Sequence, residues 1–145
     1  VGSAGTLSEK AALRSVVIGV GACTDSNYAH QFQLPGTFAP IADFDLARAA
    51  AETGERLGIK TVAGNILSSD VFYSDDSEST RKWQKMGVLA VEMEAAALYM
   101  NAARAGKKAL CLLTISDSPT SGEALSAEER QNSFTDMMKL ALEIA

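Results

Sequence analysis

The chain has 145 residues, enough for one modest hydrophobic core, and it is 47% hydrophobic and 21% charged, which is typical of a globular protein. Its formal net charge of −5 argues against nonspecific binding to nucleic acid. No apolar run approaches the roughly 20 residues that cross a bilayer, so association with a membrane is not expected.

Cysteine and histidine are scarce in this sequence. Cys23 and Cys111 lie in apolar, strand-like runs, which indicates buried thiols of a reducing, cytoplasmic compartment and not a disulfide or a metal pair. The one histidine, His30, lies in a loop, where a surface position is commoner than a role as a base. We therefore expect neither a metal site nor a nucleophile activated by histidine.

The first half of the chain alternates between strand and helix patterns. A strand is expected over 15–24, followed by a long loop, 25–40, of the kind that often serves binding. A helix is expected over 44–57, with Asp43 as its N-cap and Gly58 as its stop. Its apolar face is expected to include Phe44, Ala47, Ala51 and Leu57.

The same alternation continues to residue 106. A strand is expected over 59–67, and Gly64 inside it suggests a β-bulge. An acidic, serine-rich turn, 74–80, precedes a short helix over 81–86. The run 88–91 predicts a strand that passes directly into a helix ending at Gly106.

The last part predicts a buried strand and a helix. The continuous apolar run 108–115 is typical of a strand covered on both faces, and a loop follows over 116–125. A capping box from Ser126 to Glu129 begins a helix that runs through 144. Strands that alternate with helices predict one α/β domain over 1–145.

The stretch 87–100 changes from strand-forming to helix-forming residues, and Glu92, Met93 and Glu94 lie at the change. Open α/β sheets bind ligands at the carboxyl ends of their strands, and a glutamate there can accept hydrogen bonds from two neighbouring hydroxyls. Taken alone, a glutamate in the first turn of a helix is explained more simply by the helix dipole.

Ser116 and Asp117 directly follow the buried strand 108–115. An aspartate partly removed from water can hold a proton near neutrality and act as a general acid, although an aspartate that caps a turn is an equal alternative. Arg130 could meet Asp117 if the start of the last helix folds against this loop, and a surface arginine is the alternative.

Three further places could contact a ligand. Phe72 could stack on a flat aromatic ring or pack in the core. Met93 could pack against a sugar, although methionine usually fills cores. The backbone of Val1 and Gly2 with the hydroxyl of Ser3 could bind an anion.

Six short motifs occur along the chain: Val1-Gly2-Ser3-Ala4-Gly5, Gly21-Ala22-Cys23-Thr24-Asp25-Ser26, Asp70-Val71-Phe72-Tyr73, Val91-Glu92-Met93-Glu94-Ala95-Ala96, Thr114-Ile115-Ser116-Asp117 and Glu128-Glu129-Arg130-Gln131. Together, in this order, they resemble the bacterial, hexameric type of purine nucleoside phosphorylase. The motifs at 91–96 and 115–117 are shared across the wider superfamily of nucleoside phosphorylases and nucleosidases, whereas those at 22–26 and 128–131 narrow the resemblance to the purine branch.

The resemblance implies an α/β fold with a twisted, mixed central sheet, partly barrel-like, and flanking helices. Residues 1–145 would be the C-terminal part of a single nucleoside phosphorylase-like domain, with the N-terminal part absent. A cytoplasmic homo-oligomer, a hexamer in the family, is implied. No metal or organic cofactor is implied, because inorganic phosphate is the co-substrate.

The implied reaction, a step of purine salvage, is reversible phosphorolysis of purine (2′-deoxy)ribonucleosides to free base and (deoxy)ribose 1-phosphate. By resemblance, Glu94 holds the ribose hydroxyls, with Met93 packing the sugar and Glu92 beside it. Val1, Gly2 and Ser3 match part of the phosphate site.

The resemblance assigns the contacts with the purine base to other residues. Phe72 flanks the base, Asp117 protonates purine N7 with Ser116 adjoining it, and Arg130 assists this proton transfer. Protonation would neutralise the charge that develops on the departing base.

Two departures from the family pattern leave alternatives open. The family's phosphate-binding arginines have no counterpart, including one expected just before Val1, so this polypeptide alone is expected to have little activity. Ser118 and Pro119 stand where the family commonly has a His-Ile pair. The alternatives are a nucleosidase of the same superfamily, which uses water, and an inactive fragment that needs a complementary chain.

Overall fold

The computed structural model describes residues 1–76, 78–119 and 121–145, and only the backbone of residues 131–133. Residues 77 and 120, which belong to the expected turn 74–80 and loop 116–125, lie outside this description, as does the side chain of Gln131. The elements in chain order are β1 (Gly2–Thr6), β2 (Val16–Thr24), the 3₁₀ helix η1 (Tyr28–Phe32), α1 (Phe44–Leu57), β3 (Thr61–Ser68), α2 (Ser79–Lys85), β4 (Ala90–Glu92), α3 (Ala95–Arg104), β5 (Cys111–Asp117), α4 (Ala127–Ser133) and α5 (Thr135–Ile144).

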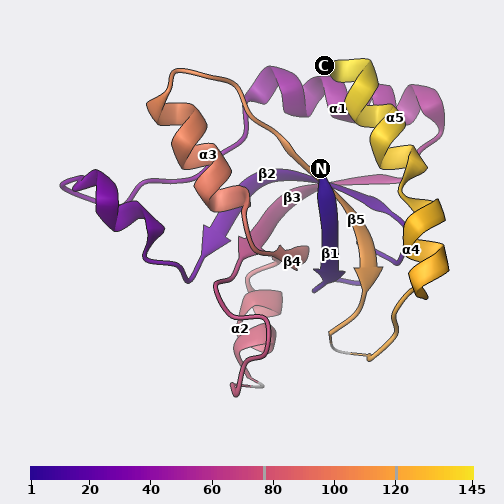
Figure 1. Cartoon of the computed structure of the whole chain (residues 1–145), viewed down its shortest axis with the longest axis horizontal. Helices are drawn as coiled ribbons and strands as arrows, with labels where there is room; N and C mark the ends of the chain where they lie inside the picture. The colour runs from indigo at the N-terminus through magenta and orange to yellow at the C-terminus, as the bar shows by residue number, and fades with distance from the viewer. Residues whose placement is uncertain (77, 120) are drawn as a thin grey trace.

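The strands of the described residues close into a barrel in the order β1-β4-β3-β2-β5, with β5 returning to β1 (Figure 1). Strand β3 is parallel to both β2 and β4, and β5 is parallel to β1. The antiparallel pairs are β1 with β4 and β2 with β5. The expected mixed sheet with flanking helices is confirmed, and its closure places β1 between β4 and β5.

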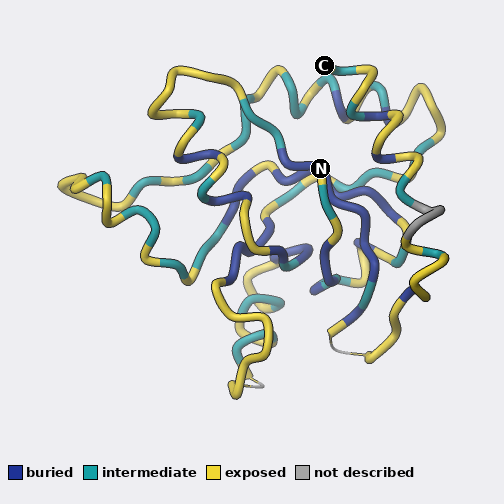
Figure 2. Tube along the Cα trace, viewed as in Figure 1, coloured by how far each residue is buried: buried dark blue, intermediate teal, exposed yellow. Residues whose placement is uncertain are grey.

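Three clusters of buried side chains lie among the described elements, and two of them hold α1, α3 and α5 on the barrel. One cluster joins β2 and β5 to α1 and α5, through side chains such as Ile18, Leu112 and Leu140. The other fills the barrel and continues under α3. Figure 2 shows that buried residues are concentrated in the strands and that α1, α3 and α5 combine buried with exposed residues.

Helix α3 is fixed to the barrel by the hydroxyl of Tyr99. This buried hydroxyl donates to the backbone oxygen of Gly19 in β2 and accepts from the backbone nitrogen of Cys111 in β5, at 2.9 Å. Burial raises the pKa of Tyr99, so the hydroxyl keeps its proton for the first of these bonds.

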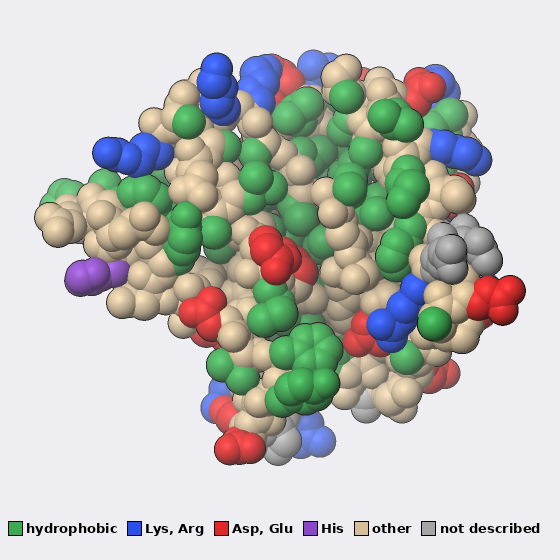
Figure 3. All heavy atoms as spheres, in the orientation of Figure 1, with side chains coloured by type: hydrophobic (Ala, Val, Ile, Leu, Met, Phe, Trp, Pro, Cys, Tyr) green, Lys and Arg blue, Asp and Glu red, His purple; other side chains and the backbone are tan. Residues whose placement is uncertain are grey.

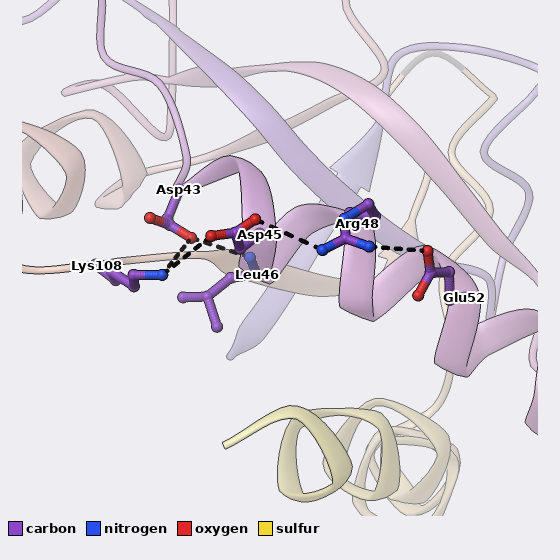
Figure 4. A network of polar contacts seen from close by, with 6 residues as sticks. All are labelled: Asp43, Asp45, Leu46, Arg48, Glu52 and Lys108. Carbon is purple, nitrogen blue, oxygen red and sulfur yellow. Dashed lines mark hydrogen bonds and ion pairs between the residues drawn. The ribbon is translucent and has the colours of Figure 1, made fainter.

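Helix α1 begins and ends where the sequence predicts. The Asp43 side chain accepts from the backbone nitrogen of Leu46 at 3.0 Å, and Gly58 adopts a φ of +68°. Lys108, just before β5, forms ion pairs with Asp43 at 3.7 Å and Asp45 at 3.3 Å (Figure 4). Its hydrogen bond to Asp45, followed by the nearby charge of Asp43, raises the pKa of Lys108.

The expected apolar face of α1 is confirmed only at Ala47, which is partly buried and packs against the cluster that joins the barrel to α1 and α5. Phe44, Ala51 and Leu57 are exposed, whereas the buried residues are Ala50 and Gly54. Small residues lie at the contact because α1 is closely packed: a Cβ on Gly54 would be 2.6 Å from the Thr61 side chain.

The bulge expected at Gly64 lies on the opposite strand. Gly64 pairs with Gly19, and the next pair joins Asn65 to Gly21, so the extra residue is Val20 of β2. A different constraint selects Gly64, because a Cβ there would lie 2.8 Å from the side chain of Leu89.

Two other expectations need correction. The helix predicted from 126 to 144 is divided into α4 and α5 at Phe134, whose side chain packs against the α1–α5 cluster. Cys111 is buried as expected, but Cys23 is only half-buried, and both thiols are free. No helix in the described part of the chain combines the length and apolarity needed to cross a membrane.

Candidate active site

Two of the candidate segments lie beside β1. Gly5 pairs with Val91 of β4 on one side and with Asp117 of β5 on the other. The segment that follows β4 and the end of β5 therefore flank one strand. Because β4 is antiparallel to β1, the chain leaves β4 toward the Gly2 end of β1, whereas Asp117 lies level with Gly5.

A β-bulge sets the position of Asp117. Ala4 pairs with Ile115 and Gly5 with Asp117, so Ser116 is an extra residue in β5. Bulges beside active sites commonly re-aim a side chain. Here one carboxylate oxygen, Oδ2, lies over Gly5, where a Cβ would be only 3.1 Å from it. Sequence reasoning gave Gly5 no role, and only the pairing of the strands reveals one.

The other carboxylate oxygen of Asp117 is held by its neighbour. The buried Ser116 hydroxyl donates to Oδ1 of Asp117 at 2.6 Å. Asp117 is half-buried and also bridges to Ala124 in the following loop. The carboxyl group is thus fixed through one oxygen while the other faces β1.

Arg130 does not meet Asp117 in this structure. Its Nε donates to the backbone oxygen of Leu125 at 3.1 Å, and no ion pair joins it to Asp117 among the described side chains. The buried Leu125 fixes the start of α4 by donating from its backbone to Ser116 at 2.8 Å. In the described part of the chain, Arg130 is thus joined to the Asp117 segment indirectly, through Leu125 and Ser116.

Glu92 caps helix α3 with its side chain. One carboxylate oxygen accepts from the backbone nitrogens of Glu94 and Ala95, both at 2.8 Å, and the other accepts from the Ser68 hydroxyl. The same hydroxyl accepts from the backbone nitrogen of Ala96 at 2.8 Å. The first backbone amides of a helix have no hydrogen-bond partner within the helix. The buried side chains of Glu92 and Ser68 supply the acceptors for them in α3.

The cap leaves the two residues after Glu92 at the surface. Met93 is 40% exposed and Glu94 is exposed. Ser68, which completes the cap from the end of β3, carried no signal in the sequence because it is distant in the chain from Glu92.

Phe72 lies in the loop after β3, at the same end of the barrel as Glu94. Strands β3 and β4 are parallel, and Ser68 pairs with Glu92, so both strands end side by side (Figure 1). Phe72 is 74% exposed and its ring stacks edge-on against Tyr73 with centroids 4.9 Å apart. The alternative of a core phenylalanine is wrong.

The anion cradle expected at 1–3 is at the surface. Val1 and Ser3 are exposed, and Ser3 shares a face of β1 with Gly5 because side chains alternate along a strand. Val1 also borders an apolar hollow of about 320 Å³ between the barrel, α1 and α5. A second hollow, of about 230 Å³, lies between η1 and α3. Neither hollow includes Glu94, Phe72 or Asp117.

Metal-binding side chains do not cluster in the described residues, where no group of three or more His, Cys, Asp and Glu is placed to hold an ion. The candidate residues offer carboxylates, hydroxyls, an exposed aromatic side chain and backbone amides. These groups suit an organic molecule that carries hydroxyls, a flat ring and an anion.

A closed mixed barrel with helices on its outside, with Glu94 just after β4 and Asp117 at the end of β5, defines an α/β protein whose candidate site lies beside one strand. The chain belongs to the phosphorylase superfamily, whose family model matches residues 1–145.

Curated relatives align with the whole or almost the whole chain. It is 44% identical over 146 residues to a DeoD-type purine nucleoside phosphorylase of Clostridium novyi, covering 100% of this chain and 62% of the relative. It is 49% identical to the protein of that name from Caldanaerobacter subterraneus, with the same coverage, and 50% identical to the one from Clostridium beijerinckii, covering 99% of this chain and 60% of the relative. The chain thus spans less than two thirds of these relatives.

A solved structure shares the fold. The purine nucleoside phosphorylase of Toxoplasma gondii, crystallised with immucillin-H, superposes with a TM-score of 0.87 at 19% identity. The match covers 98% of this chain and 59% of that one.

Proposed function

We propose that the protein that carries this chain catalyses phosphorolysis of purine nucleosides to free base and pentose 1-phosphate. The observation that carries the proposal is the double pairing of Gly5, which sets Asp117 on one side of β1 and the β4–α3 segment on the other. The names of relatives 44% and 50% identical to the chain give this geometry its substrate class.

Asp117 is the general acid of the proposed reaction. Cleavage of the glycosidic bond places negative charge on the departing purine, and a proton delivered to N7 neutralises it. Ser116 orients the carboxyl group through Oδ1, which leaves Oδ2 to carry the proton. General acid catalysis of this kind is worth about 10²–10⁴-fold. Arg130 would assist by stabilising the carboxylate that remains, after a movement from its present contact with Leu125.

The other residues bind the rest of the substrates. Glu94 accepts hydrogen bonds from the ribose hydroxyls and Met93 packs on the sugar, while Glu92 holds both in place as the cap of α3. Phe72 stacks on the base. Ser3 and the backbone of Val1 and Gly2 contact phosphate, which is the nucleophile, and no metal or organic cofactor takes part.

The protein is proposed to be a cytoplasmic homo-oligomer. Large hydrophobic side chains are exposed among charged ones, as the face in Figure 3 illustrates, and Phe44, Met86 and Leu142 are each at least 75% exposed. These three side chains lie in separate parts of the fold, so the homo-oligomer is proposed from the resemblance to the hexameric family. The two free cysteines suit a reducing compartment.

The proposal is tested by release of hypoxanthine from inosine by the gene product that contains this chain, with and without inorganic phosphate. We expect turnover that requires phosphate and forms ribose 1-phosphate. Equal release in the absence of phosphate would identify a nucleosidase instead, and no release under either condition would contradict both.

The role of Asp117 predicts a difference between substrates. In Asp117→Asn the amide can still donate a hydrogen bond to a 6-oxopurine but cannot protonate N7. We expect kcat/KM to fall about 10²-fold or more for adenosine and clearly less for inosine. Asp136→Asn, an exposed carboxylate on α5, is the matched control. Equal losses for the two nucleosides would rule out the proposed acid.

A further inference from the structure

Asp25 belongs to the 22–26 motif, yet the proposed site gives it no task. Its carboxylate lies against the segment that follows β3: Oδ2 accepts from the Ser69 hydroxyl at 2.8 Å, and Oδ1 accepts from the backbone nitrogen of Asp70 at 2.9 Å. Strands β2 and β3 are parallel neighbours, paired up to Thr24 and Ser68, so both segments leave the barrel at one end. We refer to the three residues Asp25, Ser69 and Asp70 as the Asp25 clamp.

The clamp fixes the start of the loop that carries Phe72. Ser69 is buried, and its hydroxyl also accepts from the backbone nitrogen of Val71 at 3.3 Å. Its own backbone nitrogen donates to the backbone oxygen of Glu92 at 2.9 Å. Beyond Ser69 burial no longer holds the chain, since Val71 and Phe72 are 55% and 74% exposed. The position of the loop therefore depends on the hydrogen bonds at its start.

We propose that Asp25 is a positioning residue that acts through Ser69 and Asp70 to set where Phe72 stands against the base. This inference rests on the proposed function. A carboxylate suits the task because its two oxygens accept from two donors at once. Asparagine can do the same work: its oxygen accepts from the Asp70 amide, and its NH₂ donates to the Ser69 hydroxyl, which can donate to the Val71 oxygen 3.2 Å away. Alanine loses both contacts.

Kinetics on the gene product that contains this chain test the positioning role. We expect Asp25→Ala to raise the KM for inosine about tenfold, through the cost of ordering the loop on binding, with kcat and the KM for phosphate within about twofold of wild type. Asp25→Asn should restore the KM for inosine. Asp75→Ala, an exposed carboxylate two residues beyond Tyr73, is the control and should leave all constants unchanged.

Three results would overturn the inference: an unchanged KM for inosine in Asp25→Ala, equal increases in both KM values, or an Asp25→Asn variant as impaired as Asp25→Ala. If Asp25→Ala does not fold, Ser69→Ala serves in its place, because it removes the contact at Oδ2 and keeps the one at Oδ1.

Amide hydrogen exchange separates this inference from the proposed function. Exchange at Asp70 and Val71 should be faster in Asp25→Ala than in wild type and close to wild type in Asp25→Asn. Unchanged exchange in Asp25→Ala would show that the clamp does not hold the loop. If the wild-type protein does not catalyse phosphorolysis, the proposed function is refuted, and with it the role of Phe72 beside the base. That result is independent of the exchange rates.

Discussion

At Gly5 the backbone of β1 passes directly beneath the Asp117 carboxylate and the Pro119 ring. A Cβ there would lie 2.9 Å from Cγ of Pro119 and 3.1 Å from Oδ2 of Asp117. The proline ring is rigid, and the Asp117 carboxylate is held through Oδ1 by Ser116, so neither moves aside easily. The absence of a side chain at this one position therefore sets the height of the proposed acid above the strand.

We expect Gly5→Ala to displace Asp117 and lower kcat/KM for inosine by about tenfold or more, because small misplacements of a reacting group are costly. Gly36→Ala is the control, since a Cβ on Gly36 would meet nothing within 4 Å. Activity in Gly5→Ala equal to that of Gly36→Ala would argue against a close fit of Asp117 over β1.

The two thiols are expected to differ in reactivity. Burial raises the pKa of the Cys111 thiol to about 12, whereas Cys23 is half-buried. A thiol reagent at about pH 8 should modify Cys23 in the folded protein and leave Cys111 unmodified until unfolding, because the thiolate is the reactive form. Peptide mass mapping measures both sites, and equal labelling of the two would be inconsistent with the buried position of Cys111.

At the scale of elements, α1, α3 and α4 each begin at a side chain that caps the first turn. Asp43 caps α1, Ser126 and Glu129 form the capping box of α4, and the buried Glu92 caps α3 from within β4. The first two are local and readable in the sequence. The third needs Ser68 from β3, so its full form exists only after β3 and β4 have paired.

Ser126→Ala is expected to lower the free energy of unfolding by about 1 kcal/mol, the usual effect of losing an N-cap. The backbone hydrogen bond from Ser126, then its side chain and Arg14, hold the pKa of Glu129 below its ordinary value of 4.5. The stability from Glu129 is therefore present above pH 4.5 and lost as the pH falls below that value through its folded-state pKa.

Urea unfolding at neutral pH and at about pH 3 measures both effects. The difference between wild type and Ser126→Ala should shrink at the lower pH, because the Ser126 side chain, present in the wild type alone, favours the ionised form of Glu129. Thr37→Ala, at an exposed position outside the helices and strands, is the control. A difference that grows at low pH would contradict this account.

At the scale of the whole molecule, β1 closes the barrel by pairing with both β4 and β5. A chain that begins at Leu7 would lose this strand and present two unpaired edges, with apolar surface exposed beside them. We expect such a chain to lose cooperative thermal unfolding and to aggregate, whereas Ser3→Ala, which keeps the strand, should unfold in one transition. Near-ultraviolet circular dichroism and light scattering distinguish these outcomes, and a folded monomer without residues 1–6 would contradict the importance of closure.

Local signals in the sequence were enough to predict most of the helices and strands and where they end. Asp43, Gly58 and the capping box mark helix ends through contacts a few residues apart, and apolar runs mark β2, β3 and β5. The sequence also predicted that Glu94 follows one strand and that Asp117 lies at the end of another. It could not identify the buried face of α1, the bulge at Val20 or the break at Phe134, because each depends on what packs against it.

Only the tertiary structure decided that the sheet closes, that β1 lies between β4 and β5, and that the bulge at Ser116 turns Asp117 over Gly5. The register of β1 joins Gly5 to Val91 and Asp117, which are far away along the chain. Pairing over such distances is selected by the packing of the whole barrel and not by neighbouring residues. The chain thus encodes its helix ends and acidic groups locally, while the fold alone brings those groups to one strand.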